Sequence, residues 1–296
     1  MILVTGSSGF IGKHLVKSLI SLYGRDKIVV LTSEATNDCN YLLHSNYTFD
    51  SDFFINSGYE NIDTIIHAGA FIPKMSPESN LIEACNTNIT NTEVLLAANL
   101  PNIKKIIFLS TVDVYAKTEI ISENTPVAPL TLYGQSKMYC EKMIQIWASE
   151  KEITHQILRL GHVYGPGEEK YKKIIPLVMT RVLANKPIQL FGAGNEIRTF
   201  IYISDVINAI INSMKFDKHL GIINIAGNEK IKMADLIRLI IKISKENVTI
   251  EKVEAVANPR NLIFDNEKLK ILLKSELIKI EEGLKEEWEH MKKIVS

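Results

Sequence analysis

The sequence predicts an α/β fold, a doubly wound parallel sheet followed by a smaller C-terminal substrate-binding domain. Short apolar runs alternate with helical patterns in the first half of the chain, and this alternation weakens after about Val163. Strands that read as continuous apolar runs are typical of a parallel sheet that helices cover on both faces. We expect one domain over residues 1–165, rejoined by the chain at about 200–227, and a smaller one over 166–296.

The elements follow from hydrophobic spacing, taken in chain order. The predicted strands are residues 1–4, 27–31, 64–68, 105–110 and 155–160. The first helix carries an apolar stripe at the spacing of one helix face, and Gly24 ends it. The stripe consists of Ile11, Leu15, Leu19 and Leu22. Further helices are predicted over 83–100, 134–149 and 173–184, and the last thirty residues form one charged amphipathic helix or a pair.

Composition excludes several classes of protein. Lys plus Arg and Asp plus Glu both number 34 among 296 residues, so the basic surplus typical of nucleic-acid binders is absent. The apolar runs are too short to span a membrane, and the chain starts directly with a β-rich run rather than a targeting signal. The three cysteines are widely spaced and form no metal or redox motif. We expect a cytoplasmic protein without metal, nucleic-acid or membrane partners.

A glycine-rich segment, TGSSGFIG at residues 5–12, joins the first strand to the first helix. Its glycines are Gly6, Gly9 and Gly12, a G-x-x-G-x-x-G spacing close to the dinucleotide fingerprint. One glycine permits the tight turn, one lets the backbone approach a pyrophosphate, and one lets the helix pack on the strand. The helix N-terminus then offers unpaired N–H groups to the anion. The segment therefore predicts a nucleotide site; the alternative is a plain strand-to-helix turn.

The choice between NAD and NADP stays open. An acidic residue about 20 positions after the loop normally binds the ribose hydroxyls, but Thr32 stands there and Glu34 is the nearest carboxylate. An arginine that would favour the 2′-phosphate is also missing, since no Arg lies between Arg25 and Arg159.

Tyr133 and Lys137 are four residues apart at the start of a predicted helix and share one face. A phenol is a poor base at neutral pH, but a neighbouring ammonium favours the phenolate, which can then remove a hydroxyl proton as hydride leaves to a cofactor. Tyr23 and Lys27 have the same spacing and are expected to be structural. Thr111 ends the strand before the Tyr133 helix, where ligands bind in open α/β sheets, and can polarise the reacting oxygen.

Seven sequence segments occur along the chain in the order in which one known enzyme family carries them. They are TGSSGFIG, HAGA (67–70), NITNT (88–92), STVDVY (110–115), YGQSK (133–137), LRLGHVYGPG (158–167) and RTFIYISD (198–205). Together they resemble the extended short-chain dehydrogenase/reductases, in particular the NAD-dependent epimerase/dehydratase group that acts on nucleotide sugars. The similarity runs from Met1 to about Asp205 and continues more weakly to Arg260.

The resemblance implies a Rossmann-type domain that binds NAD or NADP, with Thr111, Tyr133 and Lys137 as catalytic residues. It implies a homodimer through two helices of each subunit. The implied cofactor-binding residues are Gly6, Ser8, Gly9, Phe10, Ile11, Gly12, Thr32, Asp50 (near the adenine), Ala68, Gly69, Ala70, Asn88, Tyr133 and Lys137. The implied substrate-binding residues are Phe71, His162, Arg198 and Arg260, the two arginines holding the diphosphate.

Three departures from the family pattern bear on the reaction. Thr32 replaces the Asp usual in NAD-dependent members. Val112 stands where the 4,6-dehydratases carry the acid that expels water, so dehydration is disfavoured. His162 replaces a common Asn and can be either a proton donor or a hydrogen-bonding wall. His67 is expected to be structural, holding the loop after its strand.

The leading function is hydride transfer at carbon 4 of a nucleotide sugar, with Tyr133 as acid/base. Its two forms are a 4-epimerase that retains its NAD and a 4-keto-6-deoxysugar reductase that consumes external NADPH; the neutral Thr32 leans toward the reductase. The alternative is a non-catalytic NAD(P)-binding sensor or scaffold on the same fold.

Overall fold

The computed structural model describes residues 1–254, 261–274 and 276–295. The chain forms two compact units, and each is described by itself. Unit 1 consists of Met1–Ala116, Pro126–Leu160 and Ile207–Ile223, and unit 2 of Lys117–Thr125, Gly161–Val206 and Asn224–Ser296. The hydrophobic pattern of the sequence did not predict that residues 117–125 belong to unit 2.

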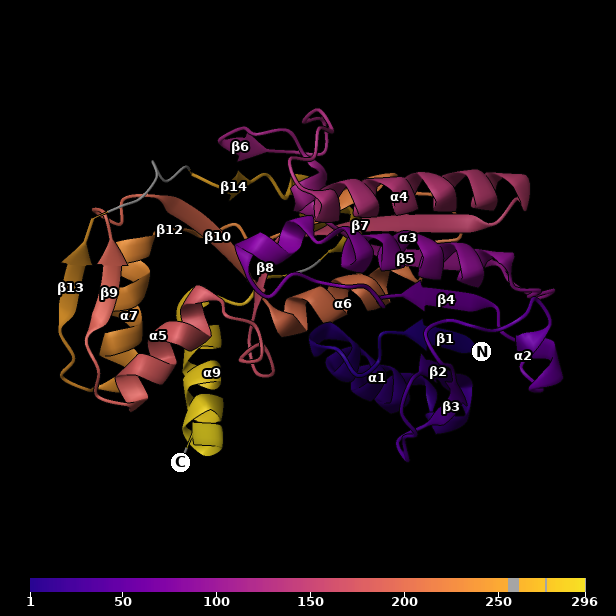
Figure 1. The fold of residues 1–296 in the computed structure, drawn as a ribbon, viewed down its shortest axis with the longest axis horizontal. Helices are drawn as coiled ribbons and strands as arrows, with labels where there is room; N and C mark the ends of the chain where they lie inside the picture. The colour runs from indigo at the N-terminus through magenta and orange to yellow at the C-terminus, as the bar shows by residue number, and fades with distance from the viewer. Residues whose placement is uncertain (255–260, 275, 296) are drawn as a thin grey trace. The chain divides into compact units, whose positions relative to one another are not determined.

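The main sheet has seven strands among the described residues, in the order β11-β7-β5-β4-β1-β2-β3 (Figure 1). The strands are β1 (Ile2–Thr5), β2 (Ile28–Thr32), β3 (Asn40–Leu43), β4 (Thr64–His67), β5 (Lys105–Thr111), β7 (Thr154–Leu160) and β11 (Ile222–Ile225). Each pairing from β3 through to β7 is parallel. The predicted doubly wound, Rossmann-type α/β fold is confirmed.

The strands form because their side chains are buried on both faces. Every residue of β1, β2 and β5 is buried, whereas β3 at the sheet edge is partly exposed. Strand order reverses at β1, which pairs with β2 on one side and β4 on the other, so that Val4 lies beside both Val30 and Ile66. A reversal of this kind opens a crevice beyond the carboxyl ends of the strands, where ligands bind.

Helices cover both faces of this sheet, with α1 on one side and α3 and α4 on the other (Figure 1). The helices are α1 (Phe10–Tyr23), α2 (Phe53–Asn56), α3 (Ile82–Ala97), α4 (Leu132–Glu150) and α6 (Ile203–Ser213), with short 3₁₀ helices η1 (Arg25–Lys27), η2 (Ser76–Asn80) and η3 (Val112–Val114). The α3 and α4 helices pack against each other. Their inner side chains join the strands in a core that includes Leu95, Phe108, Cys140 and Ile144.

Unit 2 is built from short sheets and helices. Its strands are β6 (Ile120–Ile121), β8 (His162–Tyr164), β9 (Ile188–Phe191), β10 (Ile197–Tyr202), β12 (Lys230–Lys232), β13 (Ile250–Val253) and β14 (Ile263–Phe264). Its helices are α5 (Ile174–Leu183), α7 (Met233–Ser244), α8 (Glu267–Leu273) and α9 (Ile280–Val295). The α5, α7 and α9 helices pack together. The charged C-terminal segment predicted as one helix or two corresponds to α8 and α9.

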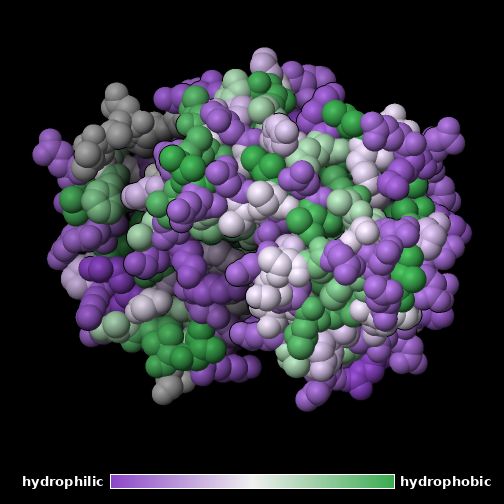
Figure 2. Space-filling view, turned by 45° about the vertical axis from the view of Figure 1, so that its right-hand side comes forward, coloured by the Kyte–Doolittle hydropathy of each residue, from purple (hydrophilic) through white to green (hydrophobic). Residues whose placement is uncertain are grey.

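Hydrophilic and hydrophobic residues are interspersed over the face shown in Figure 2. Within the described part of the chain, no helix combines the length and the apolar character that crossing a membrane requires.

Candidate active site

The glycine-rich loop between β1 and α1 has room for backbone only. Gly6 adopts a φ of 70°, in the left-handed region, and a Cβ there would lie 2.6 Å from the Cα of Gly69. A Cβ on Gly12 would lie 2.0 Å from the carbonyl oxygen of Gly6, which also accepts the Gly9 N–H at 3.0 Å. The turn and the close helix–strand packing predicted for the first and third glycines are both present.

The loop fits the pyrophosphate of a dinucleotide. It lies at the strand-order reversal beside β1 and β4. The N-cap of α1 is Gly9, which has no side chain to pair with the first N–H groups of the helix. Such a helix end attracts phosphate through its N–H groups and its dipole. The glycines form a cradle that any Cβ would fill, so the residues present are suited to the group.

The start of α4 packs tightly on the turn that follows β5. The helix begins after Thr131, whose hydroxyl accepts the Gly134 N–H at 3.1 Å. A Cβ on Gly134 would lie 2.5 Å from the carbonyl oxygen of Asp113, so only glycine allows this approach. Thr111 caps the same turn by accepting the Asp113 N–H at 3.2 Å. The turn of Thr111 thus packs on the first turn of α4, which carries the buried Tyr133.

Lys137 is buried one turn further along α4, with 3% of its surface exposed. Its Nζ lies 4.0 Å from the centroid of the Phe108 ring, a cation–π contact. Burial lowers the pKa of Lys137 to about 8, and Cys140 and Glu141 oppose this fall. The side chain therefore remains mainly protonated at pH 7, as a cation that assists a neighbouring phenol must.

Behind Lys137 lies a buried ion pair that sequence reasoning missed. Arg159 on β7 donates to both carboxylate oxygens of Glu141 on α4, at 2.9 and 2.6 Å. The Ser110 hydroxyl, just before Thr111, also donates to Glu141. Glu141 thereby ties β5, β7 and α4 together. The only signal in the sequence was its position one helical turn after Lys137.

Residues predicted on the loop after β4 are joined to α3 and α4. The side chain of Asn88 accepts the Phe71 N–H at 2.7 Å through Oδ1 and donates to Ser136 Oγ at 3.1 Å through Nδ2. Gly69 donates its N–H to Thr5 at 2.9 Å. Asn88 is 3% exposed, so it acts here as a buried link that holds the backbone of this loop.

The two residues predicted near the adenosine lie at the carboxyl end of β2 and before α2. Thr32 is buried at the end of β2, and its hydroxyl accepts the Glu34 N–H at 3.3 Å. Asp50 is exposed, and its Oδ1 accepts the Asp52 N–H at 3.0 Å. Both side chains thus also stabilise local turns.

His162 lies on β8 of unit 2, with its ring near those of Phe200 and Phe264, at centroid distances of 5.8 and 5.9 Å. Burial, followed by the charges of Arg198 and Lys173, lowers the pKa of His162 to about 4. The imidazole is therefore neutral at pH 7, which favours the hydrogen-bonding wall over the proton donor.

The two predicted phosphate-binding arginines belong to unit 2. Arg198 is half-buried on β10, and its Nη1 donates to the carbonyl oxygen of Ile197 at 3.1 Å. Arg260 lies outside the described residues.

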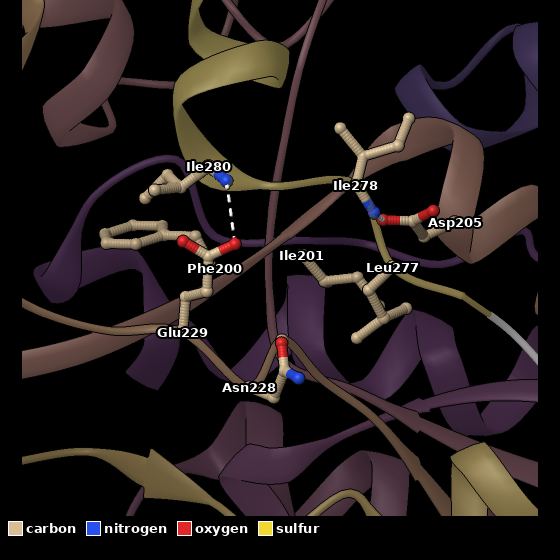
Figure 3. Close-up of a pocket in the computed structure, with 9 residues that line it drawn as sticks. Phe200, Ile201, Asp205, Asn228, Glu229, Leu277, Ile278 and Ile280 are labelled. Atoms are coloured by element: carbon tan, nitrogen blue, oxygen red, sulfur yellow. Dashed lines mark hydrogen bonds between the residues drawn. The ribbon is translucent and has the colours of Figure 1, made fainter.

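Unit 2 also contains a small pocket, shown in Figure 3. The residues that line it are Phe200, Ile201, Asp205, Gly227, Asn228, Glu229, Leu277, Ile278 and Ile280. Asp205 accepts the Ile278 N–H at 3.0 Å and Glu229 accepts the Ile280 N–H at 3.2 Å (Figure 3). Burial raises the pKa of Asp205 to about 6. The two carboxyl groups therefore hold the segment that leads into α9.

A phosphate loop at the reversal of a parallel sheet, with a buried tyrosine–lysine pair on a following helix, defines a dinucleotide-dependent enzyme of the short-chain dehydrogenase type. The family model for the NAD dependent epimerase/dehydratase family matches residues 2–226. The chain belongs to this family, and so to the extended short-chain dehydrogenase/reductases. The predicted nicotinamide cofactor agrees with the NAD dependence of the family.

Named relatives are epimerases and dehydratases of nucleotide sugars. The chain is 31% identical to a Bacillus subtilis protein described as the uncharacterized UDP-glucose epimerase YtcB, over 92% of this chain and 91% of the relative. It is 28% identical to human dTDP-D-glucose 4,6-dehydratase, over 86% of this chain and 76% of the relative. Among solved structures, UDP-glucuronic acid 4-epimerase from Bacillus cereus in complex with NAD matches with a TM-score of 0.85 and 26% identity, covering 99% and 97% of the two chains.

Proposed function

We propose that this chain is a nucleotide-sugar 4-epimerase that uses a bound nicotinamide dinucleotide. Epimerases recur among its relatives: besides the two described above, UDP-glucose 4-epimerase from Thermotoga maritima, solved with UDP-glucose, matches with a TM-score of 0.85 and 25% identity over 100% and 99% of the two chains. The observation that carries the proposal is the buried Tyr133–Lys137 pair on the first turns of α4.

In the proposed mechanism, Tyr133 removes the proton of the sugar 4-hydroxyl and later returns it. The glycine-rich loop of Gly6, Gly9 and Gly12 would hold the dinucleotide, which would supply reversible hydride transfer at carbon 4. Lys137 holds a positive charge one turn away, which favours the phenolate form of Tyr133. The Thr111 hydroxyl orients the same sugar oxygen by a hydrogen bond. His162 and Arg198 of unit 2 are proposed to bind the sugar and the diphosphate.

Replacing Tyr133 by Phe tests this role. We expect Tyr133→Phe to lower kcat by a factor of about 10² to 10⁴, because it removes the acid/base while keeping the ring. The variant should still bind the dinucleotide, because the ring and the glycine-rich loop remain. Tyr23→Phe is the matched control, since Tyr23 has the same spacing to a lysine but is 41% exposed at the end of α1. Equal turnover of Tyr133→Phe and wild type, with dinucleotide bound, contradicts the mechanism.

A second candidate, a 4-keto-6-deoxysugar reductase, is favoured by Thr32, which places no negative charge at the end of β2. The two functions differ in what they consume. An epimerase purifies with its dinucleotide and converts a nucleotide sugar without added reductant. A reductase oxidises one added NADH or NADPH for each 4-keto sugar reduced. Mass analysis of the small molecule that co-purifies, followed by assay with each substrate, separates them.

We propose that the chain does not dehydrate its substrate, although 4,6-dehydratases are among its relatives. The buried Val112, directly after Thr111, has no proton to donate to a leaving hydroxyl. Accumulation of a 4-keto-6-deoxy product from a UDP- or dTDP-hexose would overturn this proposal.

We propose that the protein is a cytoplasmic homodimer whose interface includes α3 and α4. Three apolar side chains of these helices are largely exposed in the single chain: Ile82 (66%), Tyr139 (54%) and Ile146 (48%). The three cysteines are free and buried, which suits a reducing compartment. Sedimentation equilibrium should show a dimer that Ile146→Glu weakens, whereas the exposed Leu22→Glu on α1 should leave it intact.

A further inference from the structure

Unit 1 contains a buried chain of hydrogen bonds that the proposed mechanism does not use. His67, the last residue of β4, lies between Thr5 at the end of β1 and Thr92 on α3. Its Nδ1 is 2.7 Å from Thr5 Oγ1, and its Nε2 is 3.0 Å from Thr92 Oγ1. All three residues are at most 1% exposed, so water cannot replace either bond.

The hydrogens on the α3 side can be assigned from the partners. The Thr92 hydroxyl has one proton, and at 2.7 Å from the carbonyl oxygen of Asn88 it donates that proton there, because a carbonyl only accepts. Toward His67 the Thr92 oxygen is therefore an acceptor. The proton on the His67 ring then resides on Nε2, which donates to Thr92.

The hydrogens on the β1 side agree with this assignment. Gly69 donates its N–H to Thr5 Oγ1 at 2.9 Å. The phenol of Tyr47 also hydrogen-bonds to Thr5, and burial raises its pKa to about 12, so it keeps its proton. The Thr5 oxygen accepts from these donors, and its own proton points to Nδ1 of His67. A neutral imidazole protonated on Nε2 satisfies each of these groups.

A charged His67 would also face a buried cation. Burial, followed by the charge of Lys137, lowers the pKa of His67 to about 3. Besides Tyr47, the network contains a further titratable group, the buried Cys140, whose Sγ lies 3.4 Å from Thr92 Oγ1. Burial raises the pKa of that thiol, so it is neutral as well.

We propose that His67 is a positioning residue, fixed as the neutral Nε2–H tautomer, that connects the dinucleotide loop with the helix of the catalytic pair. One side of its ring holds Thr5, the residue before Gly6. The other side holds Thr92, and the connection continues through Asn88 to Ser136, whose hydroxyl donates to the carbonyl oxygen of Tyr133 at 2.8 Å. The part of this inference that concerns turnover rests on the proposed function.

Nitrogen-15 NMR of histidine-labelled protein tests the tautomer directly. We expect the ring of His67, assigned through its own backbone, to show a protonated Nε2 and an unprotonated Nδ1 that do not change between pH 5 and pH 8. An ordinary histidine titrates near 6.5. A proton on Nδ1, or a titration near pH 6.5, overturns the proposal whatever the variants do.

Two substitutions separate the two sides of the ring. His67→Asn retains an acceptor near the Nδ1 position and loses the bond to Thr92, whereas His67→Gln retains a donor near the Nε2 position and loses the bond to Thr5. We expect His67→Gln to raise the Kd of the dinucleotide about tenfold, since one buried bond corresponds to about that factor. We expect His67→Asn to lower kcat about tenfold with an unchanged Kd. Identical losses in both variants contradict the division of roles.

Substitutions on α3 supply the matched controls. Thr92→Val, which loses the same bond, should reproduce His67→Asn. Thr90→Val should match wild type in both Kd and kcat, because Thr90 is exposed and its hydroxyl bonds, among the residues that the structure describes, only to main-chain oxygens of its own helix. If Thr90→Val and Thr92→Val have equal effects, the loss reflects α3 in general and the role of His67 is refuted.

Failure of this inference differs from failure of the proposed function. A wild-type protein that binds dinucleotide and shows the expected tautomer, but converts no nucleotide sugar, refutes the function and leaves the assignment of His67 intact. A protein that epimerises its substrate while His67 titrates near pH 6.5 refutes the inference alone.

Discussion

The ion pair between Glu141 and Arg159 offers a sharp test of how unit 1 is held together. Its side chains are 5% and 2% exposed, and two hydrogen bonds of 2.9 and 2.6 Å join them. Removing one partner leaves the other charge buried and uncompensated, which costs about 3–5 kcal/mol. We therefore expect Glu141→Leu and Arg159→Met each to lower the free energy of unfolding of unit 1 by that amount.

The double variant should be more stable than either single variant, because replacing both charges with apolar groups removes the desolvation cost along with the attraction. Because the Ser110 hydroxyl also loses its acceptor, the double variant should remain about 1 kcal/mol less stable than wild type. With an m-value of about 2–3 kcal/mol/M in urea, a loss of about 3–5 kcal/mol shifts the midpoint of each single variant by about 1–2.5 M.

The two tryptophans allow each unit to be followed separately. Trp147 lies on α4 of unit 1 and Trp288 on α9 of unit 2, and the chain has no other tryptophan. In protein labelled with 5-fluorotryptophan, fluorine NMR in urea reports both transitions. The exposed Asp235–Arg238 pair is the control: Arg238→Met should change stability by less than about 0.5 kcal/mol. Single variants at Glu141 or Arg159 that lose under 1 kcal/mol, or a double variant as unstable as their sum, would refute the reasoning.

Three further predictions concern the glycine-rich loop, the proposed catalytic Lys137 and a buried carboxyl pair. Gly12→Ala should weaken dinucleotide binding, measured by calorimetry, at least about 100-fold, because its Cβ would lie 2.0 Å from a carbonyl oxygen. Gly24→Ala is the control: nothing lies within 4 Å of its Cβ, so binding should be unchanged, and the positive φ of 86° should cost about 1–3 kcal/mol of stability. Turnover should fall as pH rises above about 8, the pKa of Lys137, because the neutral amine no longer favours the phenolate; a profile flat to pH 9.5 would contradict this. Burial raises the pKa of Glu168 to about 7 and also raises that of Glu287, so the stability that the protonated pair contributes below pH 4.5 should be lost as pH rises through 7. Glu287→Gln should make the melting temperature fall less steeply over this pH range, and an equally steep fall in the variant and the wild type would contradict the prediction.

Hydrophobic spacing was sufficient for the elements that form the sheet. The runs that became β1, β2 and β5 are apolar on both faces, and a buried parallel strand requires that. The β3 strand was missed because Asn40–Leu43 follows a polar stretch typical of a loop. Its partner is β2, so pairing rather than local pattern makes it a strand.

The residues of the candidate active site could likewise be predicted only where a local sequence pattern indicates them. Gly6, Tyr133 and Lys137 stand in local motifs, so the sequence could propose them, although the Tyr–Lys spacing also occurs at Tyr23 and Lys27 and the position after β5 was needed to choose between the pairs. The contacts of His67 reach back 62 residues to Thr5 and forward 25 to Thr92, and no local pattern encodes such distances. Glu141 and Arg159 likewise meet only because β7 and α4 pack on the same strand.

The route of the chain through its two units has a consequence for dissecting the protein. Residues 117–125 leave unit 1 between Thr111 and Tyr133, and residues 207–223 return to it to supply part of α6 and β11. No single cut therefore releases a complete unit 1. A fragment ending at residue 160 would expose one side of β7, a row of unpaired backbone groups prone to aggregation. Splitting or swapping the halves of this protein would require circular permutation or several junctions at once.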